Sequence, residues 1–176
     1  MQKKMLLQLM LGLLLMQMSM AQTPYTRSAD PKDTSVTVLK GMITKYILMN
    51  ESAFKWFSGS HDSYTAPETV VRTLADHSDK MSFILFGGTW CDDTQFILPK
   101  FFRLQELSGI PDSAVTFFGV DREKKTLGGL SEALHITNVP TIIVFSNGKE
   151  IGRVVEYGTT GKWETELAAI VKQSAN

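Results

Sequence analysis

The chain has 176 residues, of which 43% are hydrophobic and 20% charged, with 18 basic and 18 acidic side chains that cancel. This balance gives no strong field and therefore excludes a nucleic-acid or anionic-membrane partner held by charge. The length suits one domain with a substantial core. Because the chain has one cysteine, it excludes a disulfide-stapled fold.

The first residues have the pattern of an export signal. Lys3 and Lys4 precede an apolar run over residues 5–18, and Ser19-Met20-Ala21 is a small-x-small sequence before Gln22. This pattern predicts a signal peptide over residues 1–21, cleaved near Ala21/Gln22, and hence a periplasmic or secreted protein. The alternative is a membrane anchor, but the run is too short and is interrupted by glutamine. We expect no stable membrane insertion.

Two segments are predicted before the main domain. Residues 22–35 are polar and contain two prolines, which predicts a flexible lead-in. Residues 36–66 are predicted as an N-terminal helical extension. Its helix spans residues 36–57, with apolar residues at helical spacing (Leu39, Met42, Ile43, Tyr46, Ile47), and a loop follows at residues 58–63. Phe54, Trp56 and Phe57 favour core packing over a ligand site.

Residues 67–176 alternate helices and strands. Helices are predicted at residues 67–77, 95–104, 127–134 and 160–172, the last with Trp163, Leu167 and Ile170 facing inward. Strands are predicted at residues 81–87, 115–120, 141–145 and 150–156, the last two joined by an Asn147-Gly148 turn. Residues 121–125 favour a solvated loop. The order predicts an α/β fold, with a central mixed β-sheet flanked by helices.

Cys91 lies where a predicted strand passes into a predicted helix. Unpaired N–H groups and a positive dipole end favour a thiolate at a helix start, and the thiolate is the reactive form. Asp92 and Asp93 oppose it, since their charges repel a negative sulfur. A small buried apolar residue is the alternative role for this cysteine.

Four motifs resemble the thioredoxin family across about residues 68–173. Trp90-Cys91-x-x-Thr94 is similar to its Trp-Cys-x-x-Cys turn, and Pro99 takes the place of its helix proline. Asn138-Val139-Pro140-Thr141 resembles its cis-proline loop, and the Asn147-Gly148 hairpin also matches. The resemblance implies a thioredoxin-like fold with Cys91 as nucleophile beside Trp90 and Thr94. It also implies a cis Pro140, with Val139 and Pro140 forming the substrate platform.

The chain departs from the family where the resolving half of the reaction takes place. Thr94 replaces the second cysteine, Leu85 stands where the family has a buried aspartate, and Phe117 stands where it has a nearby lysine. Thr94 has two compatible roles: a hydrogen bond to the Cys91 sulfur, or satisfaction of groups at the helix start. A peroxidase is less favoured, because Gly88 stands where such sites have threonine.

Two functions remain open. One is monothiol thiol–disulfide exchange, in which an external thiol resolves the mixed disulfide. The other is a redox-inactive module that binds peptides or proteins. We expect partners that carry thiols or disulfides, including an intermolecular disulfide through Cys91, and no cofactor or metal. His61, His77 and His135 are far apart in the sequence, as expected of surface or packing histidines.

Overall fold

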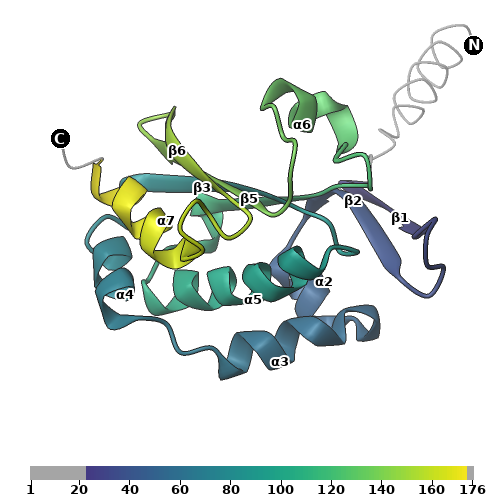
Figure 1. The fold of residues 1–176 in the computed structure, drawn as a ribbon, viewed down its shortest axis with the longest axis horizontal. Helices are drawn as coiled ribbons and strands as arrows, with labels where there is room; N and C mark the ends of the chain where they lie inside the picture. The colour runs from purple at the N-terminus through teal and green to yellow at the C-terminus, as the bar shows by residue number, and fades with distance from the viewer. Residues whose placement is uncertain (1–22, 174–176) are drawn as a thin grey trace, which may run out of the picture.

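The computed structural model describes residues 23–173 as a mixed β-sheet with helices on both faces (Figure 1). The predicted signal peptide and its cleavage site lie outside these residues. The six strands are arranged in the order β1-β2-β4-β3-β5-β6. They are β1 (Tyr25–Ala29), β2 (Thr37–Ile43), β3 (Met81–Gly87), β4 (Val115–Gly119), β5 (Thr141–Ser146) and β6 (Lys149–Val155).

The strand directions bring four connections to one end of the sheet. β3 runs parallel to β4, and their last residues, Gly87 and Gly119, are paired. β5 is antiparallel to both β3 and β6, so its first residue, Thr141, lies opposite Phe86 and Val155. The segments after β3, β4 and β6 and the segment before β5 therefore meet at the same edge.

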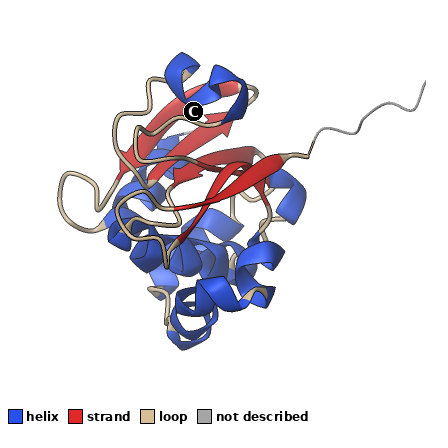
Figure 2. Cartoon of the chain, turned by 90° about the vertical axis from the view of Figure 1, so that its right-hand side faces the viewer, coloured by secondary structure: helices blue, strands red, loops and turns tan. Residues whose placement is uncertain are grey.

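The helices cover the two faces unequally. On one face lie α2 (Lys45–Asn50), α3 (Lys55–Ser63), α4 (Glu68–Ala75), α5 (Asp92–Leu107) and α7 (Trp163–Lys172), whereas the short α6 (Leu130–Ala133) lies on the other (Figures 1 and 2). Among residues 23–173, no helix combines the length and apolarity needed to cross a membrane.

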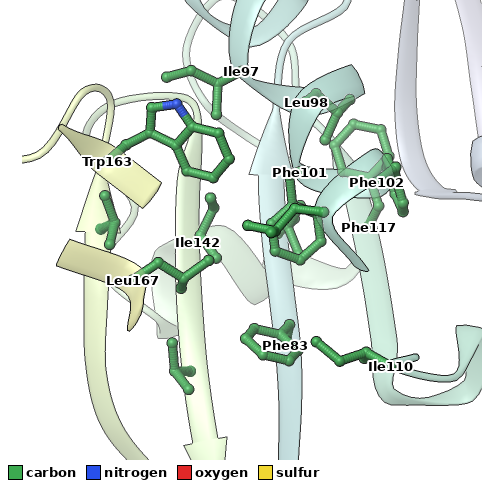
Figure 3. Close-up of a cluster of buried hydrophobic side chains, with 14 of the residues drawn as sticks. Phe83, Ile97, Leu98, Phe101, Phe102, Ile110, Phe117, Ile142, Trp163 and Leu167 are labelled. Carbon is green, nitrogen blue, oxygen red and sulfur yellow. The ribbon is translucent and has the colours of Figure 1, made fainter. Parts of the chain in front are cut away.

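The larger core lies between the sheet and the helices α5 and α7. Phe101 of α5 packs edge-on against Phe83 of β3, with ring centroids 5.7 Å apart. Trp163 and Leu167 of α7 are buried beside Ile142 of β5 (Figure 3). Burial of these large side chains is the main force that fixes α5, and with it Cys91, against the sheet.

The prediction for residues 22–66 was wrong in part. The flexible lead-in contains β1, which pairs antiparallel with β2. Four of the five β1 residues are exposed, so the strand has no alternating pattern, and Pro24 and Pro31 flank it rather than interrupt it. Residues 37–43 of the predicted helix form β2, which pairs with β4.

Two further details of the extension differ from prediction. Leu39 and Ile43 are four residues apart and both buried, a spacing that fits either a helix or one face of a strand. Met42 decides between them, because it is 48% exposed. Residues 58–63 belong to α3 instead of forming a loop. The packing of Phe57 and the buried His61 outweighs the weak helix propensity of the Ser58-Gly59-Ser60 segment.

The elements predicted after residue 66 are confirmed, with small shifts at their ends. The helix near residue 127 begins irregularly, because Gly128 and Gly129 are both at positive φ. Trp163 and Leu167 are buried as predicted, and Ile170 is half-buried against the same core. The chain therefore has the predicted α/β architecture, extended by a hairpin at the β4 edge.

Candidate active site around Cys91

Cys91 is the N-cap of α5, at the end of a tight turn that follows β3. Its N–H donates to the carbonyl of Gly88 (2.9 Å), and its carbonyl accepts the first helical bond from Gln95 (2.9 Å). The side chain is half-buried and free of any disulfide. The thiol donates to the carbonyl oxygen of Val139, 3.3 Å away. The sulfur is thus presented at the sheet end where the four connections meet.

The Val139–Pro140 peptide bond is cis, as the resemblance implies. Both residues are buried, and the loop delivers the Val139 carbonyl to Cys91. The structure therefore brings three of the predicted site residues, Trp90, Cys91 and Val139, around one shallow pocket, with Pro140 next in the chain.

The Thr94 hydroxyl is bonded to the backbone of the turn before α5. Thr94 is fully buried, and its hydroxyl oxygen accepts the N–H of Gly88 at 3.3 Å. Of the two roles predicted for Thr94, the geometry matches the second, in which the hydroxyl bonds a backbone group of the active-site turn. The hydrogen-bond partner of the Cys91 thiol is the Val139 carbonyl.

Trp90 is fixed from two sides. Its indole N–H donates to the carbonyl of Val120 (2.9 Å), and the guanidinium of Arg122 lies 4.5 Å from the ring centroid, in cation–π contact. Arg122 in turn forms an ion pair at 2.7 Å with Asp30, whose carboxylate is fully buried. The hydrogen bond from Arg122 holds the pKa of Asp30 below its usual value.

The N-terminal hairpin also holds the turn before Cys91. The Thr89 hydroxyl donates to the carbonyl of Thr37 (2.8 Å) and accepts the N–H of Leu39 (3.2 Å). Lys40 of β2 pairs with Asp121 at 2.6 Å, so residues 121–125 are fixed rather than freely solvated. Sequence reasoning missed these contacts because their partners are at least 50 positions apart, and a pair at that separation leaves no local pattern.

The interior beneath the site is apolar. Leu85 of β3 and Phe117 of β4 are register partners, and both are buried. Phe117 contacts Phe102 of α5, with ring centroids 6.4 Å apart. At these two positions, where the family has its aspartate and lysine, this chain has no group that exchanges a proton.

Charged side chains surround the pocket, which has a volume of about 170 Å³ and is lined by Trp90, Cys91, Asp93, Lys124, Asn138, Val139 and Glu156. Asn138 donates to the Glu156 carboxylate at 3.0 Å. Burial and then the Asp93 carboxylate raise the pKa of the adjacent Tyr157 hydroxyl. Acidic groups therefore lie on the α5 and β6 sides of Cys91, and a lysine lies on the β4 side.

The histidines lie away from this pocket. His61 stacks on Phe57 and lies between Asp62 (2.8 Å) and Glu106 (3.1 Å), as expected of a packing histidine. His77 bonds the Thr73 carbonyl at 2.8 Å. Within residues 23–173, no three histidine, cysteine or acidic side chains are grouped as metal ligands.

Comparison with known proteins agrees with this geometry. The Thioredoxin family model matches residues 64–173. A thioredoxin-like protein of Acanthamoeba polyphaga mimivirus is 32% identical over 88 residues, which are 50% of this chain and 61% of that protein. Thioredoxin-1 of Saccharomyces cerevisiae is 30% identical over 77 residues, which are 44% of this chain and 69% of that protein.

A solved structure of an HIV epitope scaffold superposes with a TM-score of 0.53 at 16% identity, covering 73% of this chain and 91% of the scaffold, and so shares the fold alone. The match to the mimivirus protein spans less than two thirds of its length. The segment matched by the family model contains both Cys91 and the cis Val139–Pro140 bond. The chain belongs to the thioredoxin family.

Proposed function

We propose that this protein is an exported thiol–disulfide exchange protein that works through Cys91 alone. The observation that carries the proposal is the position of Cys91. The only thiol of the chain is half-buried at the N-cap of α5, 3.3 Å from the backbone of a cis-proline loop. Membership in the thioredoxin family supports a general thiol–disulfide redox role.

The proposed reaction is an exchange with no net oxidation. The Cys91 thiolate attacks one sulfur of a partner disulfide, a new S–S bond forms, and the other sulfur leaves as a thiolate that takes a proton from water. Thr94 has no thiol with which to expel the product. An external thiol, as its thiolate, therefore attacks the partner's sulfur in the mixed disulfide, forms a new disulfide with it and releases the Cys91 thiolate.

The partner segment is proposed to lie beside the cis-proline loop. An extended peptide pairs with exposed backbone by strand addition, which gives affinity through main-chain hydrogen bonds. The Val139 carbonyl lies next to the sulfur and accepts the Cys91 thiol in the free protein, so a partner strand would take the place of the thiol there. Protein or peptide substrates with accessible thiols or disulfides fit this platform.

The apolar pair Leu85 and Phe117 favours a second candidate, a module that binds peptides without redox chemistry. Trapping separates the two. Cells that express wild type are quenched with acid, and adducts are compared on non-reducing gels with those of Cys91→Ser. Exchange predicts adducts that depend on Cys91 and vanish on reduction. Partners that co-purify equally with Cys91→Ser, in the absence of adducts, would establish the binding module.

Export is proposed from residues 1–21 and has its own test. Intact-mass measurement on protein recovered from outside the cytoplasm should give a chain that begins at Gln22. Retention of the first 21 residues would reject the cleavage and leave the chemistry at Cys91 to be judged separately.

A further inference from the structure

We infer that Lys124 and Glu156 set the substrate class of the Cys91 site. They select a thiol or disulfide segment that carries an acidic side chain on the Lys124 side and a basic side chain on the Glu156 side. The inference rests on the proposed exchange function. It starts from the pocket around Cys91, whose lining includes both charged residues.

The sheet order places the two charges on opposite sides of the sulfur. Lys124 follows β4, Cys91 follows β3, Val139 precedes β5 and Glu156 follows β6. These strands are neighbours in the order β4-β3-β5-β6, and their connections meet at one end of the sheet. A segment laid across Cys91 and Val139 therefore meets the lysine at one end and the glutamate at the other.

Both charges are available to a ligand. Lys124 is half-buried and has no ion pair with any residue between 23 and 173. Glu156 is half-buried, and one carboxylate oxygen accepts from Asn138 at 3.0 Å, which orients the group without neutralising it. The negative side is reinforced by Asp93, which lines the same pocket. A charge that is oriented but not neutralised discriminates between partners of opposite sign.

The backbone conformation of the two residues gives a further reason to assign a role to their side chains. Lys124 has φ 61° and Glu156 has φ 52°, a left-handed conformation that glycine adopts without a steric penalty. Each is held by a hydrogen bond, from Lys124 N–H to the Asp121 carbonyl (2.9 Å) and from Glu156 N–H to the Pro140 carbonyl (2.7 Å). A charged residue at each of these two strained positions points to a role for its side chain.

Four peptides of equal length test the inference, each with a central cysteine activated as a 2-thiopyridyl disulfide. One has acid before and base after the cysteine, one has the reverse order, one is neutral and one carries lysine on both sides. Released thiopyridone reports the rate of reaction with Cys91. Exposed charge pairs contribute about threefold each, so the preferred mixed-charge order should react about tenfold faster than the neutral peptide at low salt, and the reverse order should react more slowly than the neutral peptide. In about 1 M salt, where the screening length is about 3 Å, the difference should vanish.

The double variant Lys124→Glu/Glu156→Lys should exchange the preferences of the two mixed-charge peptides. Both positions keep an unbranched side chain, so the strain of their left-handed backbone is unchanged. The matched control is Asp79→Lys/Lys80→Glu, which likewise exchanges one acidic and one basic charge, at two exposed residues before β3, at the far end of the sheet. This control should react like wild type. Urea unfolding verifies that all variants are folded.

The outcomes separate this inference from the proposed function. If all four peptides react with Cys91 at equal rates, or if the double variant keeps the wild-type preference, the charge selection is wrong and exchange stands. If even the neutral peptide fails to modify Cys91, while the thiol reacts with a small alkylating agent, the exchange function is wrong and the inference falls with it.

Discussion

Thr94→Val tests what the residue in place of the second cysteine does. The two side chains are nearly isosteric, so the change removes one oxygen without opening a cavity. In wild type that oxygen is the acceptor for the Gly88 N–H at 3.3 Å, in a position with no exposure to solvent. The methyl group packs so tightly that a Cβ built on Gly87 would lie 2.7 Å from it. The variant therefore leaves a buried N–H without a partner.

The expected cost follows from that contact. An unsatisfied buried donor costs about 1–3 kcal/mol, and the 3.3 Å length of the bond places this one near the lower end, at about 1 kcal/mol. Because the hydroxyl bonds Gly88 and the Cys91 thiol bonds Val139, we expect the alkylation rate of Cys91 at neutral pH to stay within about twofold of wild type. Urea unfolding measures the first quantity, and iodoacetamide labelling followed by mass spectrometry measures the second.

Thr94→Ser is the matched control, because it keeps the oxygen and removes the methyl group. It should also lose about 1 kcal/mol, but through lost packing. Amide hydrogen exchange distinguishes the two mechanisms, since the Gly88 amide should exchange faster in Thr94→Val and not in Thr94→Ser. A tenfold change in alkylation rate in Thr94→Val, with the stability unchanged, would refute this reasoning and assign the hydroxyl to the sulfur.

Four further variants test the fold and the surroundings of the site. Gly119→Ala should lower the free energy of unfolding in urea by about 3 kcal/mol, since its Cβ would lie 2.2 Å from a carbonyl oxygen of β2. Gly59→Ala, whose Cβ meets open space within α3, should raise that free energy by about 0.5–1 kcal/mol. Hydrogen bonds from a lysine, a glutamine and a tyrosine lower the pKa of Asp112 to about 2 from 3.8. Its contribution to folding stability is therefore complete above pH 4 and is lost as the pH falls towards 2. Asp112→Asn should remove this pH dependence of stability between pH 4 and 2. Asp30→Asn should speed hydrogen exchange of the Trp90 indole N–H, measured by NMR, because the arginine against that ring loses its ionic partner.

Sequence reasoning succeeded where local pattern and tertiary structure agree. β3 is an apolar run that ends at a glycine, and the Asn147-Gly148 turn sets the hairpin that follows. These signals rest on burial and on turn chemistry, both of which act over a few residues. The positions of Cys91 and the cis Pro140 were predictable because the motifs that carry them are short and contiguous.

The failures share one physical cause, which is that tertiary contacts outweighed local preference. β1 is an exposed edge strand, which needs no hydrophobic alternation and is fixed by its pairing with β2. In the same way, the spacing of Leu39 and Ile43 is compatible with a strand, and the exposure of Met42 together with the pairing of β2 with β4 shows that the segment is one. Thr94 was assigned two roles because the sequence cannot show which way a buried hydroxyl points.

The misjudged N-terminal segment is also what links the edge of the sheet to the candidate site. β1 and β2 extend the sheet beyond β4. From there Thr37 contacts Thr89 in the turn before Cys91, and two ion pairs, Asp30 to Arg122 and Lys40 to Asp121, reach the loop after β4. Arg122 then covers Trp90, and the loop it belongs to carries Lys124 to the rim of the pocket. In the absence of a second cysteine and of a buried acid at Leu85, the site depends on how one thiol and its rim are positioned. The hairpin supplies that positioning, and loss of its Asp30–Arg122 contact should therefore affect partner selection more than the reactivity of the sulfur itself.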